Sequence, residues 1–189
     1  MTPPKATLHT APSDALAPSC VGEIRALLET AFEGDFAEED WEHAIGGTHV
    51  WVTSGEVGAP ATSEVLVSHG SLVKRTLVCS GERLTVGYVE AVATAASHRR
   101  QGHGTLVMRR LGQLIRAAHP LGALSTGTHP FYETLGWERW RGATFVDSPT
   151  GRARTPDDDH DVMILRTPRS PRLHLDGEIV CDWRTGDVW

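Results

Sequence analysis

The chain is poor in cysteine and has no long apolar run. Its 189 residues include three cysteines, Cys20, Cys79 and Cys181, which lie far apart and without the paired spacing of zinc ligands. We therefore expect reduced, core-filling thiols, no disulfide framework and no metal. No segment approaches the roughly 20 apolar residues of a membrane-spanning helix, and the first residues lack the apolar core of a signal peptide. A cytoplasmic protein without a membrane partner is the expectation.

Positive charge is also scarce. Lysine and arginine total 18 against 24 aspartate and glutamate residues, which gives a net charge of −6. Nucleic-acid binding usually requires a basic patch, so we expect no nucleic-acid partner. An acidic enzyme is better matched to a cationic substrate, although many proteins carry such a charge. The length and the 40% hydrophobic content favour a single domain over residues 1–189, with residues 1–18 extended or flexible.

The most informative stretch is a predicted strand followed by a loop and a helix. Residues 86–93 form an apolar run typical of a strand, and the loop Arg99–Gly104 follows a polar turn. The helix after the loop has apolar residues at helical spacing on one face: Val107, Leu111, Leu114, Ile115 and Ala118. This order places a glycine-containing loop at a helix N-terminus.

Such a loop suits a phosphate group. The first amides of a helix lack intrahelical partners and lie at the positive end of the helix dipole. Gly102 and Gly104 permit close backbone approach and positive φ, and Arg99 and Arg100 add positive charge. From these residues alone, a surface turn with solvated arginines is an equally good interpretation.

The remaining chain alternates strand and helix signals. A helical stripe runs from Ile24 to Phe32, and a short helix with Pro130 in its first turn ends before Gly136. Residues 33–41 are acidic, which fits either a solvated helix start with Asp35 as N-cap or a rim that binds amines. We expect strands at residues 6–10, 49–53, 65–67, 72–78, 84–93, 121–125 and 162–165, with a long turn-rich connection over residues 54–63.

The run Arg-x-x-Gly-x-Gly, beginning at Arg99, resembles the pyrophosphate-binding motif of the GNAT N-acetyltransferase superfamily. The resemblance implies an α/β (α+β) fold: a mixed, mainly antiparallel sheet, splayed at the acetyl-CoA site, with helices on both faces. It also implies acetyl-CoA as cosubstrate, held by the strand end and the loop. The implied coenzyme-binding residues are Val92, Ala93, Thr94, Arg99, Arg100, Gln101, Gly102, His103 and Gly104.

Further segments resemble the aminoglycoside 2′-N-acetyltransferases from about Ile24 to Trp189. They are FEGDFAEEDWEHAIGG, GYVEAV, RRQGHG, LGALS, FYETLGW, RTPDDD and CDWRTGDVW. The resemblance implies that an aminoglycoside is acetylated on its 2′-amino group, which confers resistance, and family members are commonly homodimers. The implied substrate-binding residues are Asp35, Asp40, Glu90, Ala91, Ser125, Asp157, Asp158, Asp187 and Trp189 with its carboxylate.

The resemblance also implies three catalytic roles. Glu90 would act as general base, directly or through water, and the Val92 N–H would hold the developing oxyanion. Tyr132 would protonate the departing thiolate. Without the resemblance, Tyr132 would be read as a core residue, because aromatics on short helices usually pack in the core.

Two segments depart from the family pattern. The connection over residues 55–63 is longer, and residues 125–130 are shorter and less serine-rich. These departures leave open a branch that acetylates kasugamycin, a smaller aminoglycoside. Acetylation of another amine, in a polyamine or a protein, and a non-catalytic CoA-binding module are the alternatives; the presence of both Glu90 and Tyr132 disfavours the module.

Overall fold

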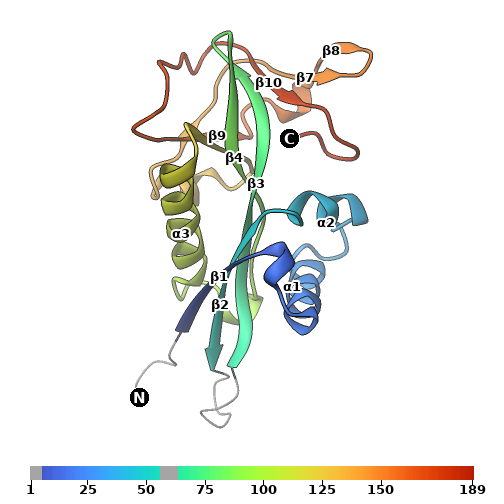
Figure 1. Cartoon of the computed structure of the whole chain (residues 1–189), viewed down its shortest axis with the longest axis vertical. Helices are drawn as coiled ribbons and strands as arrows, with labels where there is room; N and C mark the ends of the chain where they lie inside the picture. The colour runs from blue at the N-terminus through green and yellow to red at the C-terminus, as the bar shows by residue number, and fades with distance from the viewer. Residues whose placement is uncertain (1–5, 56–63) are drawn as a thin grey trace. The chain divides into compact units, whose positions relative to one another are not determined.

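The computed structural model describes residues 6–55 and 64–189 (Figure 1). The α-helices are α1 (Pro18–Ala31), α2 (Glu38–Ala44), α3 (His103–Ala118) and α4 (His129–Glu133). The strands are β1 (Ala6–Pro12), β2 (Thr48–Gly55), β3 (Glu64–Cys79), β4 (Glu82–Thr94), β5 (Leu121–Ser125), β6 (Glu138–Arg139), β7 (Thr144–Ser148), β8 (Gly151–Arg154), β9 (Val162–Arg166) and β10 (Ile179–Asp182). Three short 3₁₀ turns are η1 (Ser13–Ala15), η2 (Ala96–His98) and η3 (Pro156–Asp158).

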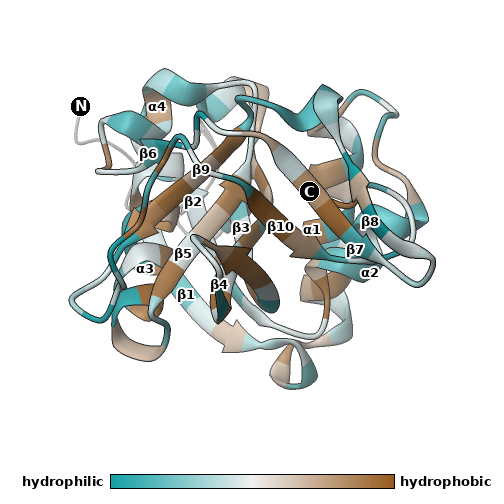
Figure 2. Ribbon diagram, turned by 90° about the horizontal axis from the view of Figure 1, so that it is seen from above, coloured by the Kyte–Doolittle hydropathy of each residue, from teal (hydrophilic) through white to brown (hydrophobic). Residues whose placement is uncertain are grey.

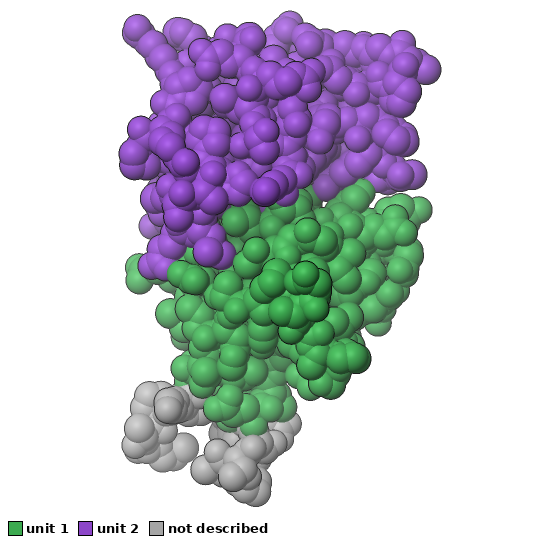
Figure 3. Space-filling model, viewed as in Figure 1, with its two compact units in different colours: residues 1–73, 90–111 green, residues 74–89, 112–189 purple. Residues whose placement is uncertain are grey.

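The chain forms two compact units, coloured separately in Figure 3. Unit 1 comprises residues 1–73 and 90–111, and unit 2 comprises residues 74–89 and 112–189. The elements β3, β4 and α3 each contribute residues to both units. The predicted single domain over residues 1–189 stays a prediction.

Unit 1 holds the N-terminal strands and helices. β1 pairs antiparallel with β2, and β2 pairs antiparallel with β3, so the predicted edge strand near the N-terminus is confirmed and extends to Pro12. In α1, Ile24 and Leu28 are fully buried and pack with Trp41 of α2 and Ala93 of β4. Figure 1 shows α1 and α2 on one face of these strands and α3 on the other.

Unit 2 contains most of the sheet, in the strand order β6-β9-β5-β4-β3-β10-β7-β8. β4–β5 and β10–β7 are parallel, whereas β5–β9, β6–β9, β10–β3 and β7–β8 are antiparallel. Both β9 and β10 are rich in hydrophobic residues (Figure 2), and Val162 to Leu165 are buried. The predicted mixed, mainly antiparallel sheet with helices on both faces is confirmed.

The predicted break in the third strand is wrong. β3 runs without interruption from Glu64 to Cys79, although separate strands were expected at residues 65–67 and 72–78. The intervening residues are polar or glycine, yet they are buried. A Cβ atom at Gly70 would come within 3.0 Å of Leu111 Cδ1, so this glycine lets α3 approach the strand.

Other local predictions hold with small changes. Ser80 (φ 53°) and Gly81 (φ 82°) form the turn between β3 and β4, as the sequence indicated. Leu111 and Ile115 are buried on the predicted face of α3, but Ala118, in its last turn, is exposed.

The three cysteines are free thiols, and Cys79 and Cys181 are buried, as predicted. Within residues 6–55 and 64–189, no helix has the length and apolar character needed to cross a bilayer. The same described residues contain no group of three or more His, Cys, Asp or Glu side chains placed to hold a metal ion.

Candidate active site

A break in regular strand geometry marks the middle of β4. Ala91 has φ 50°, a left-handed conformation that costs a non-glycine residue roughly 1–2 kcal/mol. It separates Glu90 from Val92, the two residues that the sequence predicted as general base and oxyanion donor. A left-handed residue in a strand re-aims the side chains and amides around it, as β-bulges do beside active sites. We refer to residues 90–92 as the β4 bulge.

Side chains of β3 bind the carbonyl groups around this bulge. His69 Nδ1 lies 3.0 Å from the Ala91 carbonyl oxygen, and the Ser68 hydroxyl donates to Ala93 O at 2.9 Å. The Ser71 hydroxyl donates a longer bond of 3.4 Å to Glu90 O. All three β3 side chains are fully buried. These residues were not predicted as site residues; the cluster Ser-His-Gly-Ser inside an otherwise apolar strand was the signal.

The loop after β4 is held by its own hydrogen bonds. Arg99 Nε donates to Thr94 O at 3.3 Å, and Gln101 Nε2 donates to Ser97 O at 3.1 Å. Arg100 (φ 61°) and Gly102 (φ 87°) are both left-handed. Of the two loop glycines, Gly102 has positive φ, whereas Gly104 does not, because α3 already begins at His103 and Gly104 lies in its first turn.

His103 provides a local test of whether this loop fits an anionic ligand. Its side chain is buried, with the residue 6% exposed, and neither ring nitrogen has a hydrogen-bond partner among the described residues. Burial, and to a smaller extent His98, lower the pKa of His103. A neutral imidazole has one N–H to donate, and leaving it unpaired in a buried place costs free energy. Together with the free amides at the start of α3, this ring suits a phosphate oxygen.

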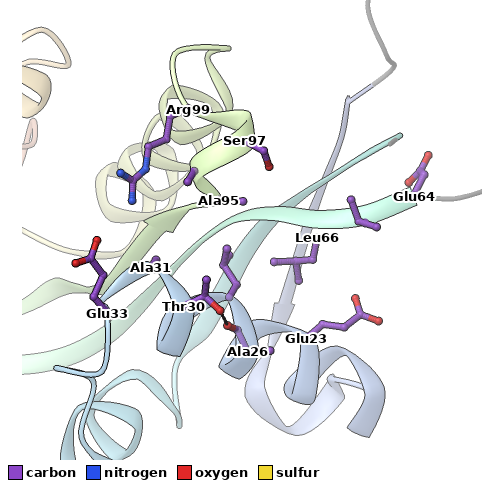
Figure 4. Close-up of a pocket in the computed structure, with 13 residues that line it drawn as sticks. Glu23, Ala26, Thr30, Ala31, Glu33, Glu64, Leu66, Ala95, Ser97 and Arg99 are labelled. Carbon is purple, nitrogen blue, oxygen red and sulfur yellow. Dashed lines mark hydrogen bonds between the residues drawn. The ribbon is translucent and has the colours of Figure 1, made fainter. Parts of the chain in front are cut away.

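A cavity of about 770 Å³ lies beside the loop (Figure 4). Its polar wall includes Glu33 and Arg99, and its apolar wall includes Leu27, Leu66 and Ala95. Figure 4 shows the side chains of Glu33 and Arg99 on one side of the cavity and Glu64 on the other. The cavity gives an elongated ligand room next to the residues expected to hold a phosphate.

The acidic segment of unit 1 has structural as well as exposed carboxylates. Asp35 is exposed and lies outside α2, so the N-cap interpretation of this residue is wrong. Asp40 Oδ2 instead accepts a hydrogen bond of 2.9 Å from the Ala37 N–H at the start of α2. Glu38 pairs with Arg25 at 2.5 Å. Of the two predicted substrate ligands here, Asp35 is fully presented to solvent and Asp40 also caps a helix.

In unit 2, Tyr132 is a buried phenol on α4. It is 8% exposed and its ring meets Trp137 edge to face, with centroids 6.3 Å apart. Burial raises the pKa of Tyr132 to about 12, and a hydrogen bond from Thr126 partly opposes the rise. The residue is therefore packed in the core and keeps its proton at neutral pH, and its catalytic role stays a prediction.

The three consecutive aspartates have different environments. Asp159 forms an ion pair with Arg154 and accepts hydrogen bonds of 3.0 Å from both the N–H and the hydroxyl of Thr144, which lower its pKa to about 2. Asp158 is half-buried, and its pKa is raised by burial and then by the charge of Asp187. Asp157 is exposed. Asp159 is thus engaged within the fold, and the substrate-binding roles of Asp157 and Asp158 stay predictions.

The C-terminal segment packs against this aspartate run. Trp189 is 3% exposed, and its indole N–H donates to Thr155 Oγ1 at 3.0 Å. Its backbone N–H donates to Asp187 Oδ1 at 3.2 Å. Arg184 Nη2 donates to Trp189 O at 3.0 Å, a contact that sequence reasoning missed. Trp189 is therefore an aromatic residue anchored by burial and by hydrogen bonds.

The predicted residues fall into two groups. Glu90 to Gly104, with Asp35 and Asp40, belong to unit 1, and Ser125, Tyr132, Asp157, Asp158, Asp187 and Trp189 belong to unit 2. Ser125 ends β5, where it is half-buried and pairs with Val162 of β9. A single site formed by both groups stays a prediction.

Comparison with known proteins gives a consistent family. Residues 15–140 match the acetyltransferase (GNAT) domain. The chain is 42% identical over 190 residues to an aminoglycoside 2′-N-acetyltransferase of Mycolicibacterium fortuitum, covering 96% of this chain and 93% of that protein.

Solved structures show the same fold at low identity. The GNAT family N-acetyltransferase YhbS of Escherichia coli, in complex with CoA, matches with a TM-score of 0.61 and 13% identity over 94% of this chain and 90% of that chain. A GCN5-related N-acetyltransferase of Kribbella flavida matches with a TM-score of 0.57 and 22% identity, over 74% of this chain but only 34% of that longer chain. The chain is an acyltransferase enzyme with a GNAT fold, and it belongs to the aminoglycoside 2′-N-acetyltransferase family.

Proposed function

We propose that this enzyme transfers the acetyl group of acetyl-CoA to the 2′-amino group of an aminoglycoside antibiotic in the cytoplasm, and so confers resistance. The observation that carries the proposal is the pair Asp158 and Asp187 beside the anchored Trp189. Burial and then the neighbouring charge of Asp187 raise the pKa of Asp158, so a bound ammonium group would relieve repulsion between the two carboxylates. An aminoglycoside carries several such groups.

Acetyl-CoA supplies a thioester whose acetyl group can pass to an amine. The residues suited to its pyrophosphate are Arg99, Arg100, Gln101 and the first residues of α3. The first amides of a helix lack intrahelical partners, and the ring of His103 has no hydrogen-bond partner within residues 6–55 and 64–189. Val92, Ala93 and Thr94, at the end of β4, would bind the arm that leads from the pyrophosphate to the thioester. The relative's complex with CoA supports this coenzyme class.

Three residues would carry the chemistry. Glu90 accepts a proton from the attacking ammonium group, directly or through water. The nitrogen then forms a bond to the thioester carbonyl carbon, and the Val92 N–H binds the oxygen as it gains negative charge. As the carbon–sulfur bond breaks, Tyr132 gives its proton to the thiolate. A phenol that stays protonated at neutral pH is suited to this last step.

The orientation of the substrate would come from carboxylates. Ammonium and hydroxyl groups would bind to Asp35, Asp40, Asp157, Asp158, Asp187 and the Trp189 carboxylate. Ala91 and Ser125 are further predicted substrate contacts. Charge-assisted hydrogen bonds fix the polycation so that one amine reaches the thioester. A homodimer is expected from the family, and its formation is part of the proposal.

The range of accepted drugs is the second part of the proposal. Within the longer connection over residues 55–63, residues 56–63 lie outside the described residues. The shortened segment after Ser125 is ordered by Thr126, whose hydroxyl accepts a 3.0 Å hydrogen bond from the Thr128 N–H. A shorter segment at this position favours a compact substrate such as kasugamycin over larger drugs.

Release of free CoA from acetyl-CoA tests the proposal, with kasugamycin, larger 2′-amino aminoglycosides, a polyamine and a lysine peptide as separate acceptors. Turnover with aminoglycosides alone supports it, and turnover restricted to kasugamycin supports the narrow range. Preference for the polyamine or the peptide would assign another amine substrate. CoA binding without turnover of any acceptor would support the non-catalytic module.

A further inference from the structure

A buried chain of hydrogen bonds connects the β4 bulge to the turn before β2. Ala91 O accepts from His69 Nδ1 at 3.0 Å, and His69 Nε2 lies 2.9 Å from His49 Nδ1. His49 Nε2 lies 2.8 Å from Ser13 Oγ, which also accepts from the Gly46 N–H at 2.9 Å. Both histidines are fully buried. All residues in this series of hydrogen bonds belong to unit 1.

The position of every hydrogen in this series of hydrogen bonds follows from the last acceptor, the carbonyl oxygen of Ala91. A carbonyl oxygen only accepts, so the hydrogen of neutral His69 must be on Nδ1, and its Nε2 must accept from His49. His49 then also carries its hydrogen on Nδ1 and accepts on Nε2, which requires the Ser13 hydroxyl as donor. The Ser13 hydroxyl also lies 3.1 Å from Gly47 O, but its contact with His49 Nε2 is shorter, at 2.8 Å, and only a hydrogen on that contact avoids two facing lone pairs. All bonds therefore point toward the bulge and polarise one another.

The charge state of the two rings agrees with this order. Burial lowers the pKa of His49 to about 4, and burial together with His49 lowers the pKa of His69 to about 3. At neutral pH each ring is uncharged and has one donor and one acceptor, which the chain uses fully. A proton relay is excluded, because the chain ends on a backbone carbonyl that has no proton to pass on.

The bond to Ala91 also fixes the next amide. The carbonyl of Ala91 and the N–H of Val92 belong to one planar trans peptide unit, in which the two groups point in opposite directions. Because His69 on β3 holds the carbonyl, the Val92 N–H is directed away from β3. Rotation of this peptide would redirect the Val92 N–H. It would also displace Glu90, which lies on the other side of Ala91.

We propose that His69, supported by His49 and Ser13, is a positioning residue for acetyl transfer: it holds the Ala91–Val92 peptide so that the Val92 N–H can bind the oxyanion. The inference rests on the proposed function for the role of that amide. The hydrogen-bond geometry itself does not depend on the substrate.

Two variants of His69 with side chains of similar shape distinguish a role in positioning the Ala91–Val92 peptide from a role in packing. In His69→Asn the amide NH₂ can replace Nδ1–H as donor to Ala91 O, whereas His69→Leu fills a similar volume without a donor. His9→Leu is the matched control, because His9 is on β1 and contacts Thr53 and Trp51 rather than the bulge. The full-length proteins are compared by kcat, by the KM for acetyl-CoA and by thermal unfolding.

The expected result is a fall in kcat of about 10²-fold for His69→Leu, the size expected when an oxyanion donor is misplaced. The KM for acetyl-CoA should change less than threefold, His69→Asn should recover kcat to within about fivefold of the wild type, and His9→Leu should leave it unchanged. Equal losses of kcat in both His69 variants, in proportion to their loss of stability, would overturn the positioning role. So would full activity of His69→Leu.

A second measurement does not require turnover. ¹⁵N NMR of the imidazole rings at pH 7 should show His69 and His49 neutral with hydrogen on Nδ1. Hydrogen on Nε2 of His69 would overturn the inference even in an active enzyme. If the wild-type protein shows the predicted tautomers but acetylates no amine, the hydrogen-bond assignment stands and the proposed function is wrong.

Discussion

The indole N–H of Trp189 donates a hydrogen bond of 3.0 Å to the hydroxyl of Thr155, which directly precedes the turn η3 with its two available aspartates. This bond fastens the C-terminal segment to the aspartate run. Asp187, two residues before Trp189, is thereby kept close enough to Asp158 to raise its pKa. The acidic surface of unit 2 is thus assembled from two distant stretches of sequence.

Trp189→Phe should weaken aminoglycoside binding while sparing acetyl-CoA binding. The variant keeps a buried ring but loses the hydrogen bond, which costs about 1 kcal/mol of stability and loosens the segment that holds Asp187. We expect the KM for the aminoglycoside to rise severalfold, as measured by steady-state kinetics. Thr155→Val removes the same bond from the other side and also the bond from Thr155 Oγ1 to Thr144 Oγ1, so its effect should be at least as large. Equal rises in the KM for both substrates would indicate general unfolding instead.

Asp187→Asn should lower the pKa of Asp158, because it removes a neighbouring negative charge. The raised pKa of Asp158 in the wild type means that this group favours folding below its unfolded pKa, and that this contribution is lost as the pH rises through the folded pKa. NMR titration of the Asp158 carboxyl measures the change. Saturating aminoglycoside should lower the same pKa in the wild type; an unchanged value would separate Asp158 from the binding site.

Glu90→Gln should reduce kcat by about 10²–10⁴-fold, because the amide cannot accept a proton from the attacking ammonium group. The limb of the pH–rate profile that reports the base should disappear with it. Glu82→Gln, at the exposed start of β4, is the matched control and should keep the wild-type profile. A profile for Glu90→Gln with the same shape as the wild type would remove Glu90 from the role of base.

Tyr132→Phe should slow turnover without changing acetyl-CoA affinity, and it should alter stability at alkaline pH. Because burial raises the pKa of Tyr132 to about 12, the neutral phenol favours folding below its unfolded pKa near 10, and this contribution is lost as the pH rises from there through about 12. The loss amounts to about 2–3 kcal/mol. Chemical unfolding at pH 9 and pH 12 should show a smaller decrease for Tyr132→Phe than for the wild type; equal decreases would place the phenol in a solvated environment.

Local sequence signals predicted the elements around the central loop, because a strand, a glycine and an amphipathic helix each have a short-range pattern. Glu90, Val92 and the residues from Arg99 to Gly102 could be named from such patterns and the family resemblance. The residues that hold them could not. His69 lies 22 positions from Ala91 and 20 positions from His49, and only strand pairing brings the three together.

The aspartate run shows the same limit. Three identical residues in sequence gave no physical reason to separate Asp159 from its neighbours, and that distinction depends on Arg154 and Thr144 across a folded turn. The exact start of α3 was a further case, because either glycine of the loop could have preceded the helix. The role of His69 and the difference between Asp159 and its neighbours both depend on hydrogen bonds between residues that are distant in sequence, which local patterns do not reveal.

The most direct test of the proposed function is acetyl transfer to a matched pair of aminoglycosides that differ only in an amino or a hydroxyl group at the 2′ position. Free CoA release and NMR of the product should show acetylation of the 2′-amino compound at that nitrogen and no turnover of its 2′-hydroxyl partner. Acetylation of both compounds at another amine would contradict the proposed regiochemistry and the substrate orientation by the carboxylates.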